Sequence, residues 1–152
     1  MANVNHSTLS DPFLHEPKGV AAASSGDVYL ANGSGSGTWT SRQSMLTVQF
    51  ANISTSSDLL VPMPYAGTVT KIQSVLSGAI SGSDTTFTVT NAAGASMGVV
   101  TVTQSGSAAG DVDTLTPSSN NTVTAGTFIK IACNGGASSH VECVIVICVD
   151  GS

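Results

Sequence analysis

The sequence is poor in charge and in aromatic residues, and each shortage excludes a class of partner. Only 9% of the 152 residues are charged, Lys and Arg number four in all, and the net charge is −5. An average soluble protein is about 25% charged. Four cations cannot follow a phosphate backbone or hold an anionic lipid surface, so we expect neither nucleic acid nor membrane as a partner. Aromatic residues make up 5%, which gives little support to a stacking platform for sugars.

A long apolar run and a secretory signal are also missing. The longest apolar run, Val144 to Val149, has the length of a strand, whereas a membrane-spanning helix needs about 18 apolar residues or more. The first residues, MANVNHSTLSDPFLHEP, contain no basic region followed by an apolar one, so no secretory signal is expected. The cysteines are odd in number, and without export they indicate reduced, buried thiols rather than disulfides: Cys133, Cys143 and Cys148.

Patterns that carry catalysis or bind metals are equally scarce. Of the three histidines only His140 lies beyond residue 42, and a catalytic triad needs a base held rigidly beside its nucleophile. The segment GSGSGT (33–38) lacks the Lys-Ser/Thr pair of a phosphate loop, and we interpret it as a turn. Asp111 and Asp113 could bind calcium, but solvated turn carboxylates are the favoured interpretation. We therefore expect no enzyme, no cofactor and no metal site.

From about residue 43 onward the chain is built of short alternating segments. Ser, Thr, Gly, Ala and Val dominate, and stretches such as MLTVQF (45–50) alternate apolar with polar residues, as half-buried strands do. Turn signals such as NAAG and NGGASS separate them. The pattern predicts an all-β fold, an antiparallel β-sandwich or jelly roll over residues 43–152. The expected strands are 45–50, 59–64 (an edge strand or a strand end, because it holds two prolines), 67–76, 85–94, 97–104, 111–117, 121–126, 127–133 and 140–150.

Residues 1–42 differ from the rest because they show no sustained periodicity. We predict an extended N-terminal arm that becomes ordered by lying on another surface. Trp39, the only tryptophan, stands near its end after a glycine- and serine-rich stretch. Two interpretations stay open for this residue: an anchor on a partner, or packing under the edge of the β domain.

The last two expected strands suggest a buried second face. The loop NGGASS predicts that 127–133 and 140–150 form a hairpin with Cys133 opposite His140. In the run ECVIVICV both sets of alternate residues become apolar, whereas a surface strand of a monomer keeps one face polar. A covering segment or another subunit is therefore expected over one of these faces, which contains Val144, Val146 and Cys148.

Two stretches resemble a known family. HEPKGVAAASSGDVYLANGSGSGTWT (15–40) resembles a segment near the N-termini of tailed-bacteriophage structural proteins, in which the pattern GDVYxANGxGSGTW precedes a β domain. VPMPYAGTVTKIQSVLSGAISGSDTTFTVTNAAGASMG (61–98) resembles the β domain of phage capsid decoration (cement) and head-fibre proteins. Together the two stretches cover well over half of the chain.

The resemblance implies a structural virion protein on the capsid exterior, assembled in the host cytoplasm. It implies a homotrimer in which 43–152 form the trimerising knob and 1–42 form arms that contact the major capsid protein. The expected arm anchors are Phe13, Leu14, Tyr29, Leu30 and Trp39, because buried aromatic residues carry most interface energy. The expected trimer interface is the apolar last strand: Val144, Val146 and Cys148.

Another class of function stays open beside this one. A tail-associated or head-fibre adhesin that binds a host surface glycan, even weakly, would share the β-rich composition. A polysaccharide depolymerase would need clustered carboxylates at glycosidase spacing, and the nine acidic residues are scattered along the chain.

Overall fold

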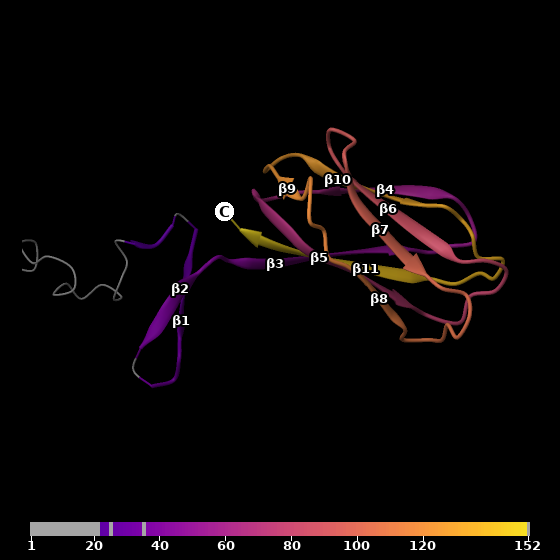
Figure 1. Ribbon diagram of the computed structural model, residues 1–152, viewed down its shortest axis with the longest axis horizontal. Coiled ribbons are helices and arrows are strands. Elements are labelled where there is room, and N and C mark those ends of the chain that lie inside the picture. Colours follow the sequence, from indigo (N-terminus) through magenta and orange to yellow (C-terminus); the bar gives the residue numbers. More distant parts are fainter. Residues whose placement is uncertain (1–21, 25, 35, 152) are drawn as a thin grey trace, which may run out of the picture. The chain divides into compact units, whose positions relative to one another are not determined.

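A computed structural model describes residues 22–24, 26–34 and 36–151. The chain divides into two compact units, one of Met1–Arg42 with Gly151–Ser152 and one of Gln43–Asp150. The described part of the first unit is a two-stranded antiparallel hairpin, β1 (Val28–Ala31) and β2 (Gly37–Thr40) (Figure 1). The predicted extended conformation is therefore wrong for 28–40, because the chain folds back on itself there.

The second unit is a sandwich of two antiparallel sheets (Figure 1). One sheet is ordered β3 (Gln43–Phe50), β11 (Cys143–Gly151), β5 (Gly67–Leu76) and β8 (Val112–Leu115), with the short β9 (Thr122–Val123) also paired to β5. The other is ordered β4 (Ser57–Pro62), β10 (Phe128–Cys133), β6 (Thr85–Asn91) and β7 (Ser96–Val102). All nine strands predicted beyond residue 43 are present, and the all-β prediction is confirmed.

The order of the strands distinguishes a jelly roll from other sandwiches. With β9 set aside, one sheet holds the first, eighth, third and sixth strands of the unit, and the other holds the second, seventh, fourth and fifth. Successive strands thus exchange sheets except between the fourth and fifth, which form a hairpin across the turn at 92–95. Two interlocked Greek keys of this kind make a jelly roll.

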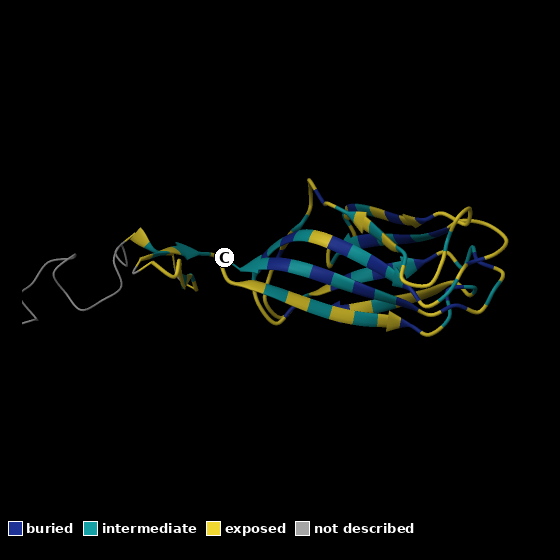
Figure 2. Ribbon diagram, turned by 90° about the horizontal axis from the view of Figure 1, so that it is seen from below, coloured by how far each residue is buried: buried dark blue, intermediate teal, exposed yellow. Residues whose placement is uncertain are grey.

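Alternation along each strand builds the core. In β11, Cys143, Ile145, Ile147 and Val149 are buried, while the residues between them are half-buried on the outer face. Phe50 of one sheet meets Phe87 of the other with ring centroids 5.1 Å apart. Figure 2 shows buried residues alternating with more exposed ones along the strands, as two sheets packed face to face require.

The predicted hairpin of 127–133 with 140–150 is wrong, because β10 and β11 lie in different sheets. Cys133 pairs with Phe87 and Ser57, not with His140. The connecting loop crosses between the sheets, and its backbone is bonded to the start of β6 and to the loop that precedes it. The amide of Ala137 donates to the Thr85 hydroxyl (3.0 Å), and the amide of Ser138 donates to the Ser81 carbonyl (2.7 Å).

Candidate functional site

The hairpin in the first unit carries three of the predicted anchors. Tyr29 lies directly opposite Trp39, and their rings meet edge to face with centroids 5.3 Å apart. Such an aromatic pair contributes about 0.5–1.5 kcal/mol beyond the area it buries. Leu30 lies on the opposite face, across from Thr38. Phe13 and Leu14 lie outside the described residues.

Local features of the sequence explain why the chain turns here. The side-chain oxygen of Asn32 accepts hydrogen bonds from the amides of Ser34 (2.9 Å) and Ser36 (3.2 Å). Gly33 adopts a positive φ of 74° in this turn, a conformation that glycine tolerates at low cost. Gly37 stands on the aromatic face, where a Cβ would lie 2.8 Å from the ring of Tyr29. Glycine at 37 therefore leaves room for the ring.

One face of the hairpin exposes aliphatic surface, and the aromatic pair on the other face is half-buried. Opposite the aromatic pair, Leu30 is 57% exposed and Val28 is 38% exposed. An isolated two-stranded hairpin is at best marginally stable in water. A hairpin with an aromatic face and an aliphatic face gains stability when a partner covers it, which is what a binding element needs.

The outer face of the β3–β11–β5 sheet carries the second set of predicted residues. Val144, Val146 and Cys148 are half-buried there and form a row along β11. Each has an uncharged partner on β3: Gln49, Thr47 and Met45, in that order. At one end of the row is a hollow of about 240 Å³ lined by Gln43, Ser44, Met45, Thr70, Lys71, Cys148 and Asp150.

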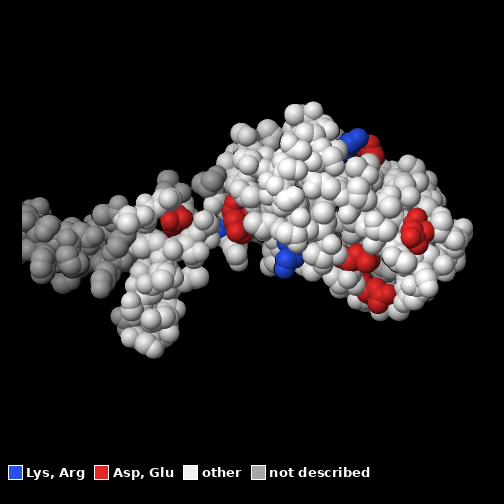
Figure 3. All heavy atoms as spheres, in the orientation of Figure 1, with Lys and Arg blue, Asp and Glu red and all other residues white. Residues whose placement is uncertain are grey.

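Met45 extends this apolar row to the margin of the sheet, where it is 74% exposed. The sequence singled out the last strand but missed Met45, because the pairing of the first strand with the last is a feature of the topology. Figure 3 shows how sparse the charge is: on the visible face, a few charged groups, some of them next to one another, are separated by broad uncharged surface.

The three cysteines are free thiols with different surroundings. Cys133 and Cys143 are buried, and Cys148 is half-buried on the outer face. Burial raises the pKa of Cys143 to about 12 and also raises the pKa of Cys133. Two thiols therefore act as small core residues, as expected, and the third lies among the residues predicted to join subunits.

Of the carboxylates in this part of the sandwich, Asp111 and Asp84 bond to loop amides, whereas Asp113 lies in β8. Asp111 accepts a hydrogen bond from the amide of Ala108 (2.6 Å), and Asp84 accepts one from the amide of Gln104 (2.7 Å). Burial, followed by the nearby charge of Asp111, raises the pKa of Asp113. Within the described ranges, no group of three or more His, Cys, Asp or Glu residues is placed to hold a metal ion.

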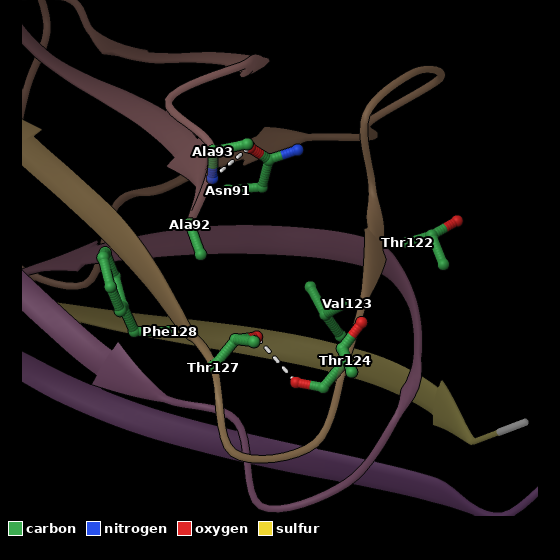
Figure 4. Close-up of a pocket in the computed structure, with 8 residues that line it drawn as sticks. All are labelled: Asn91, Ala92, Ala93, Thr122, Val123, Thr124, Thr127 and Phe128. Atoms are coloured by element: carbon green, nitrogen blue, oxygen red, sulfur yellow. Dashed lines mark hydrogen bonds between the residues drawn. The ribbon is translucent and has the colours of Figure 1, made fainter.

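A shallow hollow of about 180 Å³ lies between the β6–β7 turn and the segment from β9 to β10 (Figure 4). Small-molecule sites are usually larger, about 300–1,000 Å³. Its polar groups are largely bonded to the protein itself: the Asn91 side-chain oxygen accepts from the amides of Ala93 and Ala95, and the Thr127 hydroxyl donates to the Thr124 carbonyl. Phe128, 38% exposed, is its aromatic wall.

Among the comparisons with known proteins, only the search of solved structures gives matches. No family model matches the chain, and no curated protein matches it. Among solved structures, a chain of the cyanophage Pam1 capsid asymmetric unit matches over 100% of both chains, with 14% sequence identity and a TM-score of 0.47. In the described part of the chain, no helix is both long and apolar enough to cross a bilayer.

Proposed function

We propose that the protein is a non-enzymatic structural component of a phage virion that decorates and stabilises the outer surface of the capsid as a homotrimer. The observation that carries this proposal is the hairpin of 28–40, which is apolar on both faces and belongs to a compact unit separate from the jelly roll. The resemblance of 15–40 to the N-terminal segment of phage structural proteins covers the same residues.

The arm acts by burial rather than by charge. The described anchors Tyr29, Leu30 and Trp39 offer aromatic and aliphatic surface on opposite faces, and the major capsid protein is the proposed partner. Interface energy concentrates in a few such buried residues, with tryptophan and tyrosine foremost among them. Three arms on one trimer add avidity, because the second and third arms bind at a high effective concentration.

The jelly roll supplies the trimer contact in this proposal. The row Val144, Val146 and Cys148 is half-buried and faces outward, and its neighbours on β3 are uncharged. The uncharged neighbours favour such a contact, because burying a threonine or glutamine that keeps a hydrogen bond costs far less than burying an unpaired charge.

Capsid reconstitution tests the arm. Purified protein is added to capsids that lack it, and occupancy is measured by cryo-electron microscopy and co-sedimentation. Trp39→Ala should weaken binding by about 30-fold, equivalent to about 2 kcal/mol, as for an interface hot spot. The matched control is Leu60→Ala, which removes an apolar side chain that is 61% exposed on β4.

An equal loss of capsid binding in Trp39→Ala and Leu60→Ala would show that the arm is not the binding element. Failure of the wild-type protein to occupy the shell would overturn capsid decoration and favour the tail-associated or head-fibre adhesin.

The trimer has its own test by sedimentation and native mass spectrometry. Val146→Asp places a charge in the middle of the outer row and should dissociate the trimer. Val99→Asp is the control, because Val99 is 44% exposed on β7 of the other sheet. Thermal denaturation of both variants checks that the jelly roll is intact. A trimer that survives Val146→Asp would exclude this face as the interface.

A further inference from the structure

The sandwich has four edge strands, and three of them carry protection against pairing with another chain. Edge β4 holds the charged Asp58 and Pro62. Edge β7 is irregular, with a register shift beside β6 and Gly98 at a φ of 135°. Edge β8 is only four residues long and includes Asp113. Charge, proline, bulges and shortness are the features that keep sheet edges from joining.

Edge β3 has none of these protections. It runs for eight residues, QSMLTVQF, without a charged residue, proline or glycine. Its pairing with β11 continues without a shift from Gln43 to Phe50. Within the residues that the structure describes, no strand lies beyond it. Figure 2 shows it at one margin of the sandwich, as an alternation of exposed and half-buried residues.

The direction of the free backbone groups follows from one hydrogen bond. The backbone amide of Gly151 donates to the backbone carbonyl of Arg42 (2.7 Å). The backbone N–H and C=O of Arg42 therefore point toward β11. Because antiparallel pairs alternate, the even-numbered residues of β3 also point toward β11, and the odd-numbered residues point to the open edge. The outward residues are Gln43, Met45, Thr47 and Gln49.

We propose that this edge binds the same edge of a second copy, so that two β3 strands pair antiparallel about a two-fold axis. The register that pairs all four outward residues places Gln43 opposite Gln49 and Met45 opposite Thr47 of the second copy. The two-fold axis then passes by Leu46. Every pair in this register joins residues of the same face, so the two sheets continue into each other without exchanging core and surface.

A second copy is the occupant that the strand itself favours. With no charge on β3, self-pairing brings no like charges together, whereas like charges directly opposite each other are destabilising. The core-side residues nearest the open edge are only partly buried: Leu46 and Val48 of β3 and Leu59 of β4. A second copy paired along β3 covers these three apolar side chains as well as the outward N–H and C=O groups of the strand.

The contact is distinct from the trimer face, because it uses the edge of the sheet rather than its outer surface. Where both exist, the two-fold contact links trimers to one another. The number of copies then tests the β3 contact: it is expected to give two or six copies, and one or three copies exclude it.

The test uses the full-length protein, a 15.1 kDa chain, and counts copies by native mass spectrometry and sedimentation velocity. Wild type should contain two or six copies. Thr47→Pro removes an outward N–H while leaving the pairing with β11, so it should give one or three copies. The matched control Thr47→Val keeps the N–H and the approximate shape of the side chain, and should behave as wild type.

Covalent trapping provides an independent measurement. Leu46→Cys places two thiols across the axis, within the Cα separation that a disulfide spans. Mild oxidation should yield a covalent dimer, and adding Thr47→Pro should prevent it. Wild type under the same oxidation is the control for the three natural cysteines. One or three copies for wild type, or an even copy number that persists in Thr47→Pro, would overturn the proposal.

Discussion

Ser74 and Asp113 lie directly opposite each other on the neighbouring strands β5 and β8. Ser74 is fully buried, and its hydroxyl has no hydrogen-bond partner within the part of the chain that the structure describes. Asp113 beside it has a pKa raised first by burial and then by Asp111. This end of the sandwich therefore contains polar groups that lower its stability.

Ser74→Ala should raise the free energy of unfolding by about 1 kcal/mol, because it removes a buried hydroxyl that loses its water without gaining a partner. Chemical denaturation measures the change. Ser57→Ala on the exposed start of β4 is the control and should be close to neutral. A clear loss of stability in Ser74→Ala would show that the hydroxyl is bonded in solution.

Gly37→Ala should disturb the aromatic pair of the hairpin. A Cβ at this position meets the ring of Tyr29 and the carbonyl of Leu30, so the ring must move away from Trp39. Trp39 is the only tryptophan, so the fluorescence emission of the protein reports on the surroundings of this residue. The emission should shift in Gly37→Ala and stay unchanged in Thr38→Ala, whose side chain lies on the other face. An unshifted spectrum in both variants would contradict the pairing.

One thiol per chain should react with a water-soluble reagent in the native, dissociated protein. Cys148 is half-buried, whereas Cys133 and Cys143 are 2% and 0% exposed. Unfolding should release all three. In the assembled trimer Cys148 should be protected, so slow labelling that becomes fast in Val146→Asp would support the outer-row interface. Equally fast labelling in both would count against it.

Stability should fall as the pH rises above about 9. The pKa of Cys143 is raised from 9.0 to about 12 by burial, so the unfolded chain loses this proton first. The contribution of the protonated Cys143 thiol to the free energy of unfolding is complete below pH 9 and is lost progressively between pH 9 and 12. Over that range the free energy of unfolding falls by about 1.4 kcal/mol per pH unit. Cys143→Val should remove this part of the slope in urea denaturation measured across that range. If the free energy of unfolding of Cys143→Val fell with pH as steeply as that of wild type, ionisation of the buried thiol would not be what destabilises the protein.

Alternation identified the strands from sequence because one face of each strand is buried. The segment 67–76 was predicted with the bounds that β5 has, since Gly67 and the following loop delimit a clear apolar pattern. The prolines of 59–64 predict an edge strand or a strand end, because proline lacks an N–H, and β4 lies at an edge.

Which strands pair could not be read from the same pattern. The loop 134–139 has the composition of a hairpin turn, yet it joins two sheets, because its backbone groups bond to residues 81–85 rather than across the turn. The hairpin at 28–40 is the opposite case, a real hairpin whose strands give only a weak signal in the sequence. Its strands have four residues each and too little alternation, and the signal that remained was Asn32-Gly33 between Leu30 and Trp39.

The pairing of the first strand with the last determines where foreign peptides can be displayed. Gln43 at the start of β3 lies opposite Asp150 near the end of β11, so a C-terminal fusion emerges at the junction of these two strand ends. Loops at the other end of the strands, such as 103–110 around the exposed Gly106, point away from that junction. Exposed loop tips tolerate insertions best, so an epitope placed beside Gly106 should leave the pairing of β3 with β11 undisturbed where a C-terminal fusion would crowd it.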